Sequence, residues 1–187
     1  MPSVHRFTVE QYHQLGDAAI LTPEDRVELI DGWIREKPVQ KPPHARCVAR
    51  LVRIILRIIP ETYEFLSQLP ITLPTSEPEP DIVVAQGPEE RYDDAHPGPG
   101  DVAMVIEVSD STLEFDRGPK LLIYAAARLP VYWIVNIPDR RVEVYTNPRA
   151  GRRPTYRTRT NYRRGSKIPI VLDGRTVGGI PVNDLLP

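Results

Sequence analysis

The chain has one cysteine and no long apolar run, and each shortage excludes a class of protein. Cys47 alone cannot form an intrachain disulfide, which excludes a small domain held together by disulfides. The most apolar stretch, residues 51–59, contains Arg53 and Arg57 and is too short to cross a bilayer. Residues 1–16 lack the uncharged core of a signal peptide. We therefore expect a cytoplasmic protein without a membrane anchor.

The chain also carries little net charge. Its formal value of −1 gives the chain as a whole no electrostatic attraction to nucleic acid. Basic residues nevertheless gather in residues 149–167, which contain no acidic residue. The cations there are Arg149, Arg152, Arg153, Arg157, Arg159, Arg163, Arg164 and Lys167. Two interpretations stay open: a solvated face of two strands, or a surface that follows phosphates while Tyr156 and Tyr162 stack on bases.

The length of 187 residues suits a single domain, 1–187, with a substantial apolar core. The 21 prolines cluster in residues 38–43, 70–80 and 88–99. Apolar runs resume after each cluster. We therefore expect rigid connections between strands there and no disordered segment.

The first third of the chain predicts two helices and a hairpin. Residues 8–15 begin with a capping-box pattern and predict a short helix that ends at Gly16. Residues 27–36 predict a hairpin, since Asp31-Gly32 tolerates the positive φ of a tight turn. Residues 43–59 carry apolar side chains at intervals of three and four and predict an amphipathic helix.

The rest of the chain predicts mainly strands, with one further helix over residues 117–128, where Pro119 suits the first helical turn. The predicted strands are 63–73, 80–85, 102–108, 131–135, 142–145, 154–160, 167–172 and 176–180. The order over residues 43–136 is helix, three strands, helix, strand. This order indicates an α/β fold with a mixed sheet flanked by helices, an N-terminal hairpin and extra C-terminal strands. We expect Trp33 and Trp133 in the core.

Two carboxylates lie on apolar strands, where an unpaired charge is costly. Asp81 begins the strand over residues 80–85, and Glu107 closes the strand over residues 102–108. If these strands are neighbours, both side chains can bind one hard cation such as Mg²⁺, with Mn²⁺ as a substitute. The carbonyl of Val108 could supply a third oxygen. The alternative is a pair of strand-end carboxylates that cap loops or meet arginines.

Three further residues are candidates for the same site. Lys120 follows shortly after Glu107 and, on a helix, shares a face with Tyr124, for which we expect packing and a hydroxyl partner. Its ammonium can orient a metal-bound water and offset charge on a phosphate, although a solvated helix lysine is the alternative. Glu28 lies on the first hairpin strand and could add a carboxylate or pair with an arginine. His44 could contact phosphate, carry a proton or cap its helix.

The element order and these residues resemble the PD-(D/E)XK restriction-endonuclease-like superfamily and, within it, the Uma family. The resemblance runs through nearly the whole chain up to Tyr145. It rests on segments 6–12, 27–32, 76–81, 105–111, 116–121 and 132–135. The superfamily's usual lysine, two positions after Glu107, is Ser109 here. In the Uma family this lysine lies on the following helix, at a position that Lys120 occupies here.

The resemblance implies a nuclease-type site in which Asp81 and Glu107 bind Mg²⁺, Glu28 lies nearby and Lys120 takes the motif lysine's role. We expect hydrolysis of DNA phosphodiester bonds by a metal-activated water. RNA or branched DNA would need the same chemistry and stay open as substrates. A homodimer would provide two sites for two strands. The competing hypothesis is a non-catalytic module that binds nucleic acid or protein and retains the fold.

Overall fold

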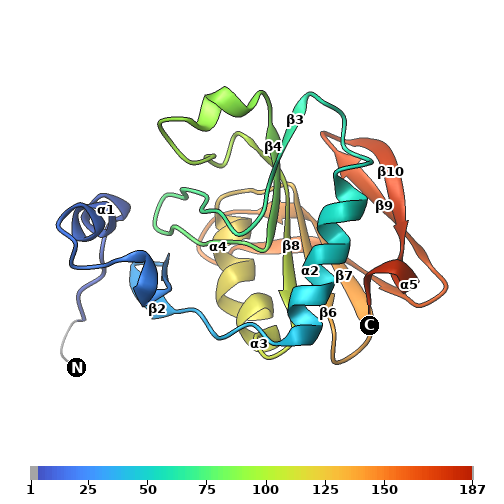
Figure 1. Cartoon of the computed structure of the whole chain (residues 1–187), viewed down its shortest axis with the longest axis horizontal. Coiled ribbons are helices and arrows are strands. Elements are labelled where there is room, and N and C mark those ends of the chain that lie inside the picture. The colour runs from blue at the N-terminus through green and yellow to red at the C-terminus, as the bar shows by residue number, and fades with distance from the viewer. Residues whose placement is uncertain (1–3, 187) are drawn as a thin grey trace.

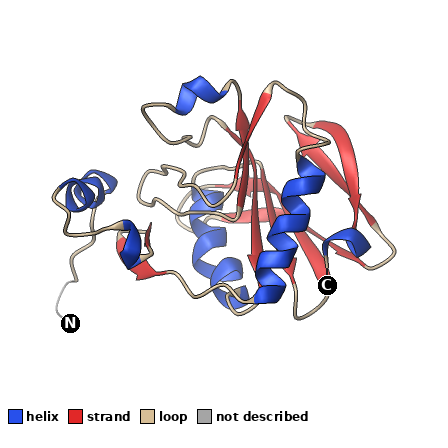
Figure 2. Ribbon diagram, in the orientation of Figure 1, coloured by secondary structure: helices blue, strands red, loops and turns tan. Residues whose placement is uncertain are grey.

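A mixed sheet with helices on both faces forms the centre of the computed structural model, which describes residues 4–186 (Figures 1 and 2). The six strands lie in the order β3-β4-β5-β6-β7-β8. All neighbours are antiparallel except β5 and β6, which are parallel. The strands of this sheet are β3 (Tyr63–Leu66), β4 (Ile82–Gln86), β5 (Val102–Ser109), β6 (Val131–Asn136), β7 (Arg141–Arg149) and β8 (Thr155–Arg163).

Two small hairpins complete the strands, β1 (Val27–Ile30) with β2 (Trp33–Glu36) and β9 (Lys167–Leu172) with β10 (Arg175–Pro181). The helices are α1 (Val9–Asp17), η1 (Pro23–Asp25), α2 (Pro42–Ile55), η2 (Glu89–Tyr92), α3 (Leu113–Phe115), η3 (Asp116–Lys120), α4 (Leu121–Ala126) and α5 (Val182–Leu185). The predicted α/β class is confirmed, as is the order helix, three strands, helix, strand over α2 to β6.

Apolar cores lie on both faces of the sheet, because alternate residues of a strand point to opposite sides. Ile82 packs on the face covered by α2, where Leu51 is fully buried. Val83 packs on the other face, under Tyr124 of α4. Every residue of β5 is buried, which explains why that strand has no polar alternation.

The N-terminal elements follow their local signals with one exception. Thr8 and Gln11 form the predicted capping box of α1. The hairpin turn has positive φ at both Asp31 and Gly32, as its sequence predicts. The prediction that Gly16 ends α1 is wrong, since the helix continues to Asp17. A single glycine weakens a helix by only about 1 kcal/mol and does not have to end it.

The end of α2, the length of β3 and the burial of Trp33 also differ from the sequence-based prediction. α2 ends at Ile55, and residues 56–59 form turns before Pro60. β3 covers only residues 63–66 of the predicted 63–73, because the prolines that follow cannot supply ladder hydrogen bonds. Trp33 is 43% exposed, so its assignment to the core is wrong, whereas Trp133 is fully buried.

The second long helix begins earlier than predicted and contains a π-helical turn. It starts at Leu113, not at residue 117, and Pro119 lies inside the π-helical segment η3. Proline was expected in the first turn because its missing N–H costs nothing there. The wide turn instead accommodates it within the helix. η3 brings Asp116 and Lys120 into the protein interior, where both are buried.

The C-terminal hairpin packs against α2 and its following turn. Ile168 and Ile180 join the apolar core on the α2 face. At Gly178 an added Cβ would lie 2.3 Å from Cγ2 of Ile58, so only glycine permits this approach. No helix within residues 4–186 has the length and apolarity needed to cross a membrane.

Candidate active site

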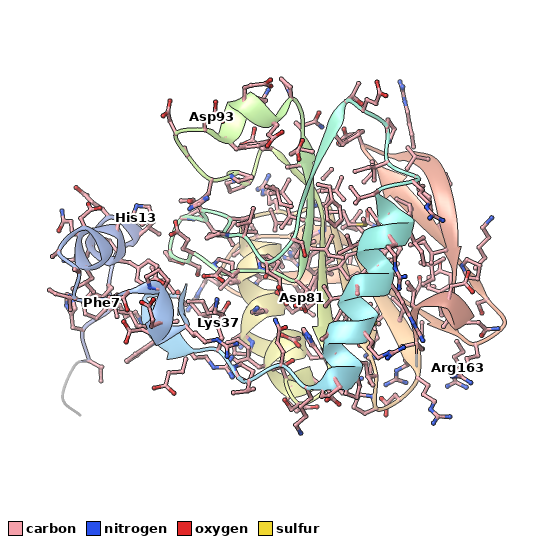
Figure 3. All side chains as sticks on the ribbon, viewed as in Figure 1. Phe7, His13, Lys37, Asp81, Asp93 and Arg163 are labelled. Atoms are coloured by element: carbon pink, nitrogen blue, oxygen red, sulfur yellow. The ribbon has the colours of Figure 1, made fainter. Side chains whose placement is uncertain are left out.

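A cleft of about 460 Å³ opens where β4 begins and β5 ends. Its walls come from the β1–β2 hairpin, the start of α2 and the turn that precedes α4. Figure 3 shows Asp81 in this region, between α2 and the chain segments around α4. All the predicted site residues, Glu28, Asp81, Glu107, Val108 and Lys120, line this cleft.

Asp81 stands directly before β4 and is 8% exposed. The antiparallel register pairs Ile82 with Ile106, so the next position places Asp81 opposite Glu107. Asp81 Oδ2 accepts a hydrogen bond from the backbone N–H of Val108 at 2.7 Å. His44 Nε2 lies 3.2 Å from the same oxygen. The carboxylate is thus held by the neighbouring strand on one side and by α2 on the other.

Glu107 points to the face of the sheet that α4 covers, and it is 4% exposed. Its Oε1 accepts hydrogen bonds from Lys120 Nζ at 2.8 Å and from the Tyr124 hydroxyl at 2.7 Å. Burial raises the pKa of Glu107, and the positive charge of Lys120 opposes that rise. The expected hydroxyl partner of Tyr124 is therefore Glu107 itself.

Lys120 is 6% exposed, so it is not a solvated helix lysine. Its ammonium lies 2.8 Å from Glu107 Oε1 and 3.3 Å from Glu28 Oε2. Burial alone would lower the pKa of Lys120, but the charges of Glu107 and Glu28 outweigh it and hold that pKa above its ordinary value. The side chain therefore remains a cation at neutral pH.

Glu28 belongs to the same ionic group, although it lies far away in the sequence. It is 3% exposed, and its Oε2 accepts the backbone N–H of Glu79 at 3.3 Å. Arg35 is its cross-strand neighbour in the hairpin, yet no ion pair joins the two within the part of the chain that the structure describes. Glu28 instead pairs with Lys120.

His44 lies in the first turn of α2 and lines the cleft. Burial lowers the pKa of His44, but the hydrogen bond to Asp81 and its charge outweigh this effect and raise that pKa. Its Nδ1 is buried and has no hydrogen-bond partner among the described residues. No side chain caps α2 with a hydrogen bond, and His44 instead contacts the Asp81 carboxylate, which was not among its expected roles.

Asp116 is a buried residue of the cleft to which sequence reasoning gave no role. Its Oδ2 accepts hydrogen bonds of 2.6 Å from both Ser109 and Thr112. Ser109, which stands where the superfamily usually has lysine, thus ties the end of β5 to η3. The signal that could have found Asp116 is its i, i+4 spacing to Lys120 within one helical segment.

Among the carboxylate oxygens of the cleft that accept no hydrogen bond within residues 4–186 are Asp81 Oδ1 and Glu107 Oε2. Mg²⁺ is usually held by one or two carboxylates, with water and phosphate as its other ligands. These oxygens therefore fit a hard divalent cation. In the same residues, no group of three or more histidine, cysteine, aspartate or glutamate side chains is arranged to hold a metal ion. Any metal here would depend on two carboxylates and on oxygens from elsewhere.

Basic side chains line the same cleft as the carboxylates. They come from η1 to α2 and are Arg26, Arg35, Lys37 and Lys41. No residue of the basic segment 149–167 lines this cleft. Figure 3 shows Arg163 and Lys37 on opposite sides of Asp81. Tyr156 is 7% exposed and donates its hydroxyl to the carbonyl of Leu129, so it is a core residue and offers no open ring for a base.

A family model and a solved structure each match most of the chain. Residues 9–176 match a family model described as "Putative restriction endonuclease" (Uma2). The fold is similar to the crystal structure of a "putative nuclease belonging to DUF820" from Anabaena variabilis, with a TM-score of 0.72 and 18% identity. The match covers 96% of this chain and 97% of that one. No curated protein matches the chain.

Proposed function

Because the chain belongs to the Uma2 restriction-endonuclease family, we propose that it is a Mg²⁺-dependent endonuclease that hydrolyses phosphodiester bonds of DNA. The observation that carries the proposal is the convergence of Asp81, Glu107 and Lys120 in one cleft. Two carboxylates can hold a metal ion that activates a water, and a buried ammonium can stabilise the negative charge that develops on the phosphate.

In this proposal Asp81 Oδ1 and Glu107 Oε2 hold the metal, and the carbonyl of Val108 is a candidate third oxygen. Mg²⁺, or Mn²⁺ in its place, supplies positive charge that makes a water more acidic and neutralises the phosphate. The hydrogen bond from Val108 N–H and the contact with His44 fix the Asp81 carboxylate in the orientation that leaves Oδ1 open to the cleft.

Lys120 acts as a fixed cation that orients the attacking water and stabilises negative charge on the phosphate. It is not a general base in this proposal, because the neighbouring carboxylates keep its pKa above the ordinary value. Glu28 is the second carboxylate that pairs with the ammonium. Glu28 is thus a positioning residue for the Lys120 cation.

The setting of the activity is part of the same proposal. We take residues 1–187 as one domain that works in the reducing cytoplasm, for which the buried free thiol of Cys47 is the support. A homodimer would supply two sites for the two strands of a duplex. RNA and branched DNA remain substrates to compare, since the cleft residues act on the phosphate and not on the sugar.

The decisive experiment incubates the purified chain with plasmid, single-stranded DNA and RNA in Mg²⁺, Mn²⁺ or EDTA. We expect cleavage with either metal and none in EDTA. Asp81→Asn should lower the cleavage rate about a hundredfold to a thousandfold, as the loss of one preorganised electrostatic group does. Paramagnetic resonance of Mn²⁺ should show one bound ion in the natural protein and loss of that ion in Asp81→Asn.

A matched control is Glu90→Gln, which removes an exposed carboxylate outside the cleft and should leave cleavage unchanged. Asp81→Asn prepared in parallel also controls for a contaminating nuclease. Cleavage that persists in Asp81→Asn at the natural rate would contradict the proposal.

One observation favours the alternative, a non-catalytic binding module. Glu107 Oε1 already accepts two hydrogen bonds, so Lys120 and Tyr124 satisfy part of its charge without any metal. A module of this kind would bind nucleic acid in EDTA and leave it intact with every metal. Unchanged DNA together with retained binding would replace the nuclease proposal with this one.

A further inference from the structure

An apolar groove of about 790 Å³ lies beside the cleft, between the β1–β2 hairpin and α4. Its volume is within the range of about 300–1,000 Å³ that is typical of ligand sites. Trp33 and Leu122 line it and are 43% and 46% exposed. Asp31 is the acidic residue of its lining, and Arg6 pairs with that carboxylate at 2.6 Å. The groove thus offers flat apolar surfaces and little negative charge.

The groove and the cleft share a wall made by Arg35 and Phe115, which line both. The guanidinium of Arg35 lies 3.3 Å from the centroid of the Phe115 ring. Within residues 4–186, Arg35 makes no ion pair with a carboxylate. A stacked arginine without an acidic partner is suited to contact phosphate while its plane faces a ring.

One residue of the basic segment also lines the groove. Pro154 lines the groove, and Arg152 and Arg153 directly precede it and are exposed. The groove therefore combines the rings of Trp33 and Phe115 with the cation of Arg35, and two exposed arginines precede Pro154 in its lining. Proteins that bind single strands combine such cations with rings on which bases stack.

We propose that this groove binds unpaired nucleobases of the substrate strand whose phosphate enters the cleft. The inference rests on the proposed nuclease function and deepens it, because it names a strand with unpaired nucleotides as the substrate. Bases in a regular duplex face each other and cannot stack on Trp33. Arg35 would hold the phosphate that joins the nucleotide in the groove to the one in the cleft.

Intrinsic tryptophan fluorescence tests this directly in EDTA, where no cleavage interferes. The chain has 2 tryptophans, of which Trp133 is fully buried, so a stacked base can quench only Trp33. We expect oligothymidylate and oligouridylate to quench the signal. A blunt oligo(dA)·oligo(dT) duplex should leave it unchanged. The relative affinities of the DNA and RNA strands then distinguish the two sources of unpaired bases.

Fluorescence anisotropy of a labelled oligothymidylate measures the affinity of each variant for a single strand. Leu122→Glu and Trp33→Ala should each weaken binding roughly tenfold, within the range that one stacked base contributes. The matched control is Leu56→Glu, which puts the same charge at another exposed leucine, at the end of α2 and outside the groove. It should change affinity on the order of twofold or less. Circular dichroism confirms the fold of each variant.

Two results would overturn the inference. One is binding of the duplex as tight as that of the single strand, with both groove variants neutral. The other is a dimer of the natural chain that Leu122→Glu converts to a monomer in sedimentation, because the groove would then hold a second copy. Neither result affects cleavage of duplex DNA by Asp81 and Glu107. Conversely, if the chain binds single strands through the groove but never cleaves them, the nuclease proposal is refuted and the inference about the groove stands.

Discussion

Glu107 and Glu143 lie in one row across the sheet, separated by Ile134, which pairs with both. The same π-helical turn provides a cation to each carboxylate. Lys120 contacts Glu107, and Arg117 donates to Glu143 through two nitrogens. Glu107 opens to the cleft, whereas Glu143 is fully buried. One helical segment is thus fixed at two points, a structural one and one in the candidate site.

Removal of the Lys120 cation should affect both stability and activity. Lys120→Met leaves Glu107 and Glu28 buried without their counterion, and this costs about 3–5 kcal/mol. We expect urea unfolding in EDTA to show that loss and cleavage assays to show no activity. The double variant Lys120→Met with Glu107→Gln should recover much of the stability and none of the activity. If Lys120→Met cleaves DNA at the rate of the natural chain, the lysine is only a structural counterion.

Glu143 should make the stability depend on pH at acid values. Burial would raise its pKa, but hydrogen bonds from Arg117, Asn136 and Tyr145 outweigh this and lower the pKa from 4.5 to about 2. A carboxyl with a lowered pKa contributes stability above pH 4.5, and the contribution disappears as the pH falls towards 2. The shift corresponds to roughly 3 kcal/mol.

Urea unfolding at a series of pH values measures this effect. Glu143→Gln should be less stable than the natural chain at pH 7, and the difference should shrink between pH 4.5 and 2. Glu90→Gln, at an exposed position, serves as the control and should follow the natural pH curve. A stability difference that stays constant with pH would show that the charge of Glu143 is not its source.

Tyr124→Phe should weaken the fold without abolishing activity. The hydroxyl donates to Glu107 at 2.7 Å, and a hydrogen bond to a charged group contributes about 2 kcal/mol. Lys120 still holds the same oxygen, so we expect cleavage within about tenfold of the natural rate. Tyr132→Phe is a fitting comparison, because its buried hydroxyl donates to the backbone carbonyl of Asp116 and should cost about 1 kcal/mol. Complete loss of cleavage in Tyr124→Phe alone would give this hydroxyl a catalytic role.

Gly178→Ala should destabilise the packing of the C-terminal hairpin on α2. The added Cβ would lie 2.3 Å from Ile58 Cγ2, and overpacking of this kind costs about 1–3 kcal/mol. Thermal unfolding should show the loss, and cleavage at a temperature where both proteins are folded should be unchanged. Ile58→Ala in the same chain should restore part of the stability, since it removes the clashing atom. An additive effect of the two substitutions would contradict this explanation.

Much of the fold could be predicted because its signals are local. The capping box at Thr8, the Asp31-Gly32 turn and the apolar run of β5 each determine their own element. The predicted start of the second long helix was wrong, because Pro119 was expected in the first helical turn but lies in the π-helical turn. Trp33 was misplaced, since its burial depends on what the hairpin packs against and not on its neighbours in sequence.

The candidate site also has a part that the sequence predicts and a part that depends on the tertiary structure. The sequence by itself determined which strands carry Asp81 and Glu107, since apolar runs surround both carboxylates. The resemblance to the Uma family predicts that Lys120 takes the role of the lysine absent at Ser109. Only the tertiary structure decided that Glu28 approaches the Lys120 ammonium and that Asp116 is buried beside it. The contact between Glu28 and Lys120 joins segments far apart in the chain, and the burial of Asp116 and Lys120 depends on a π-helical turn that the sequence pattern did not predict.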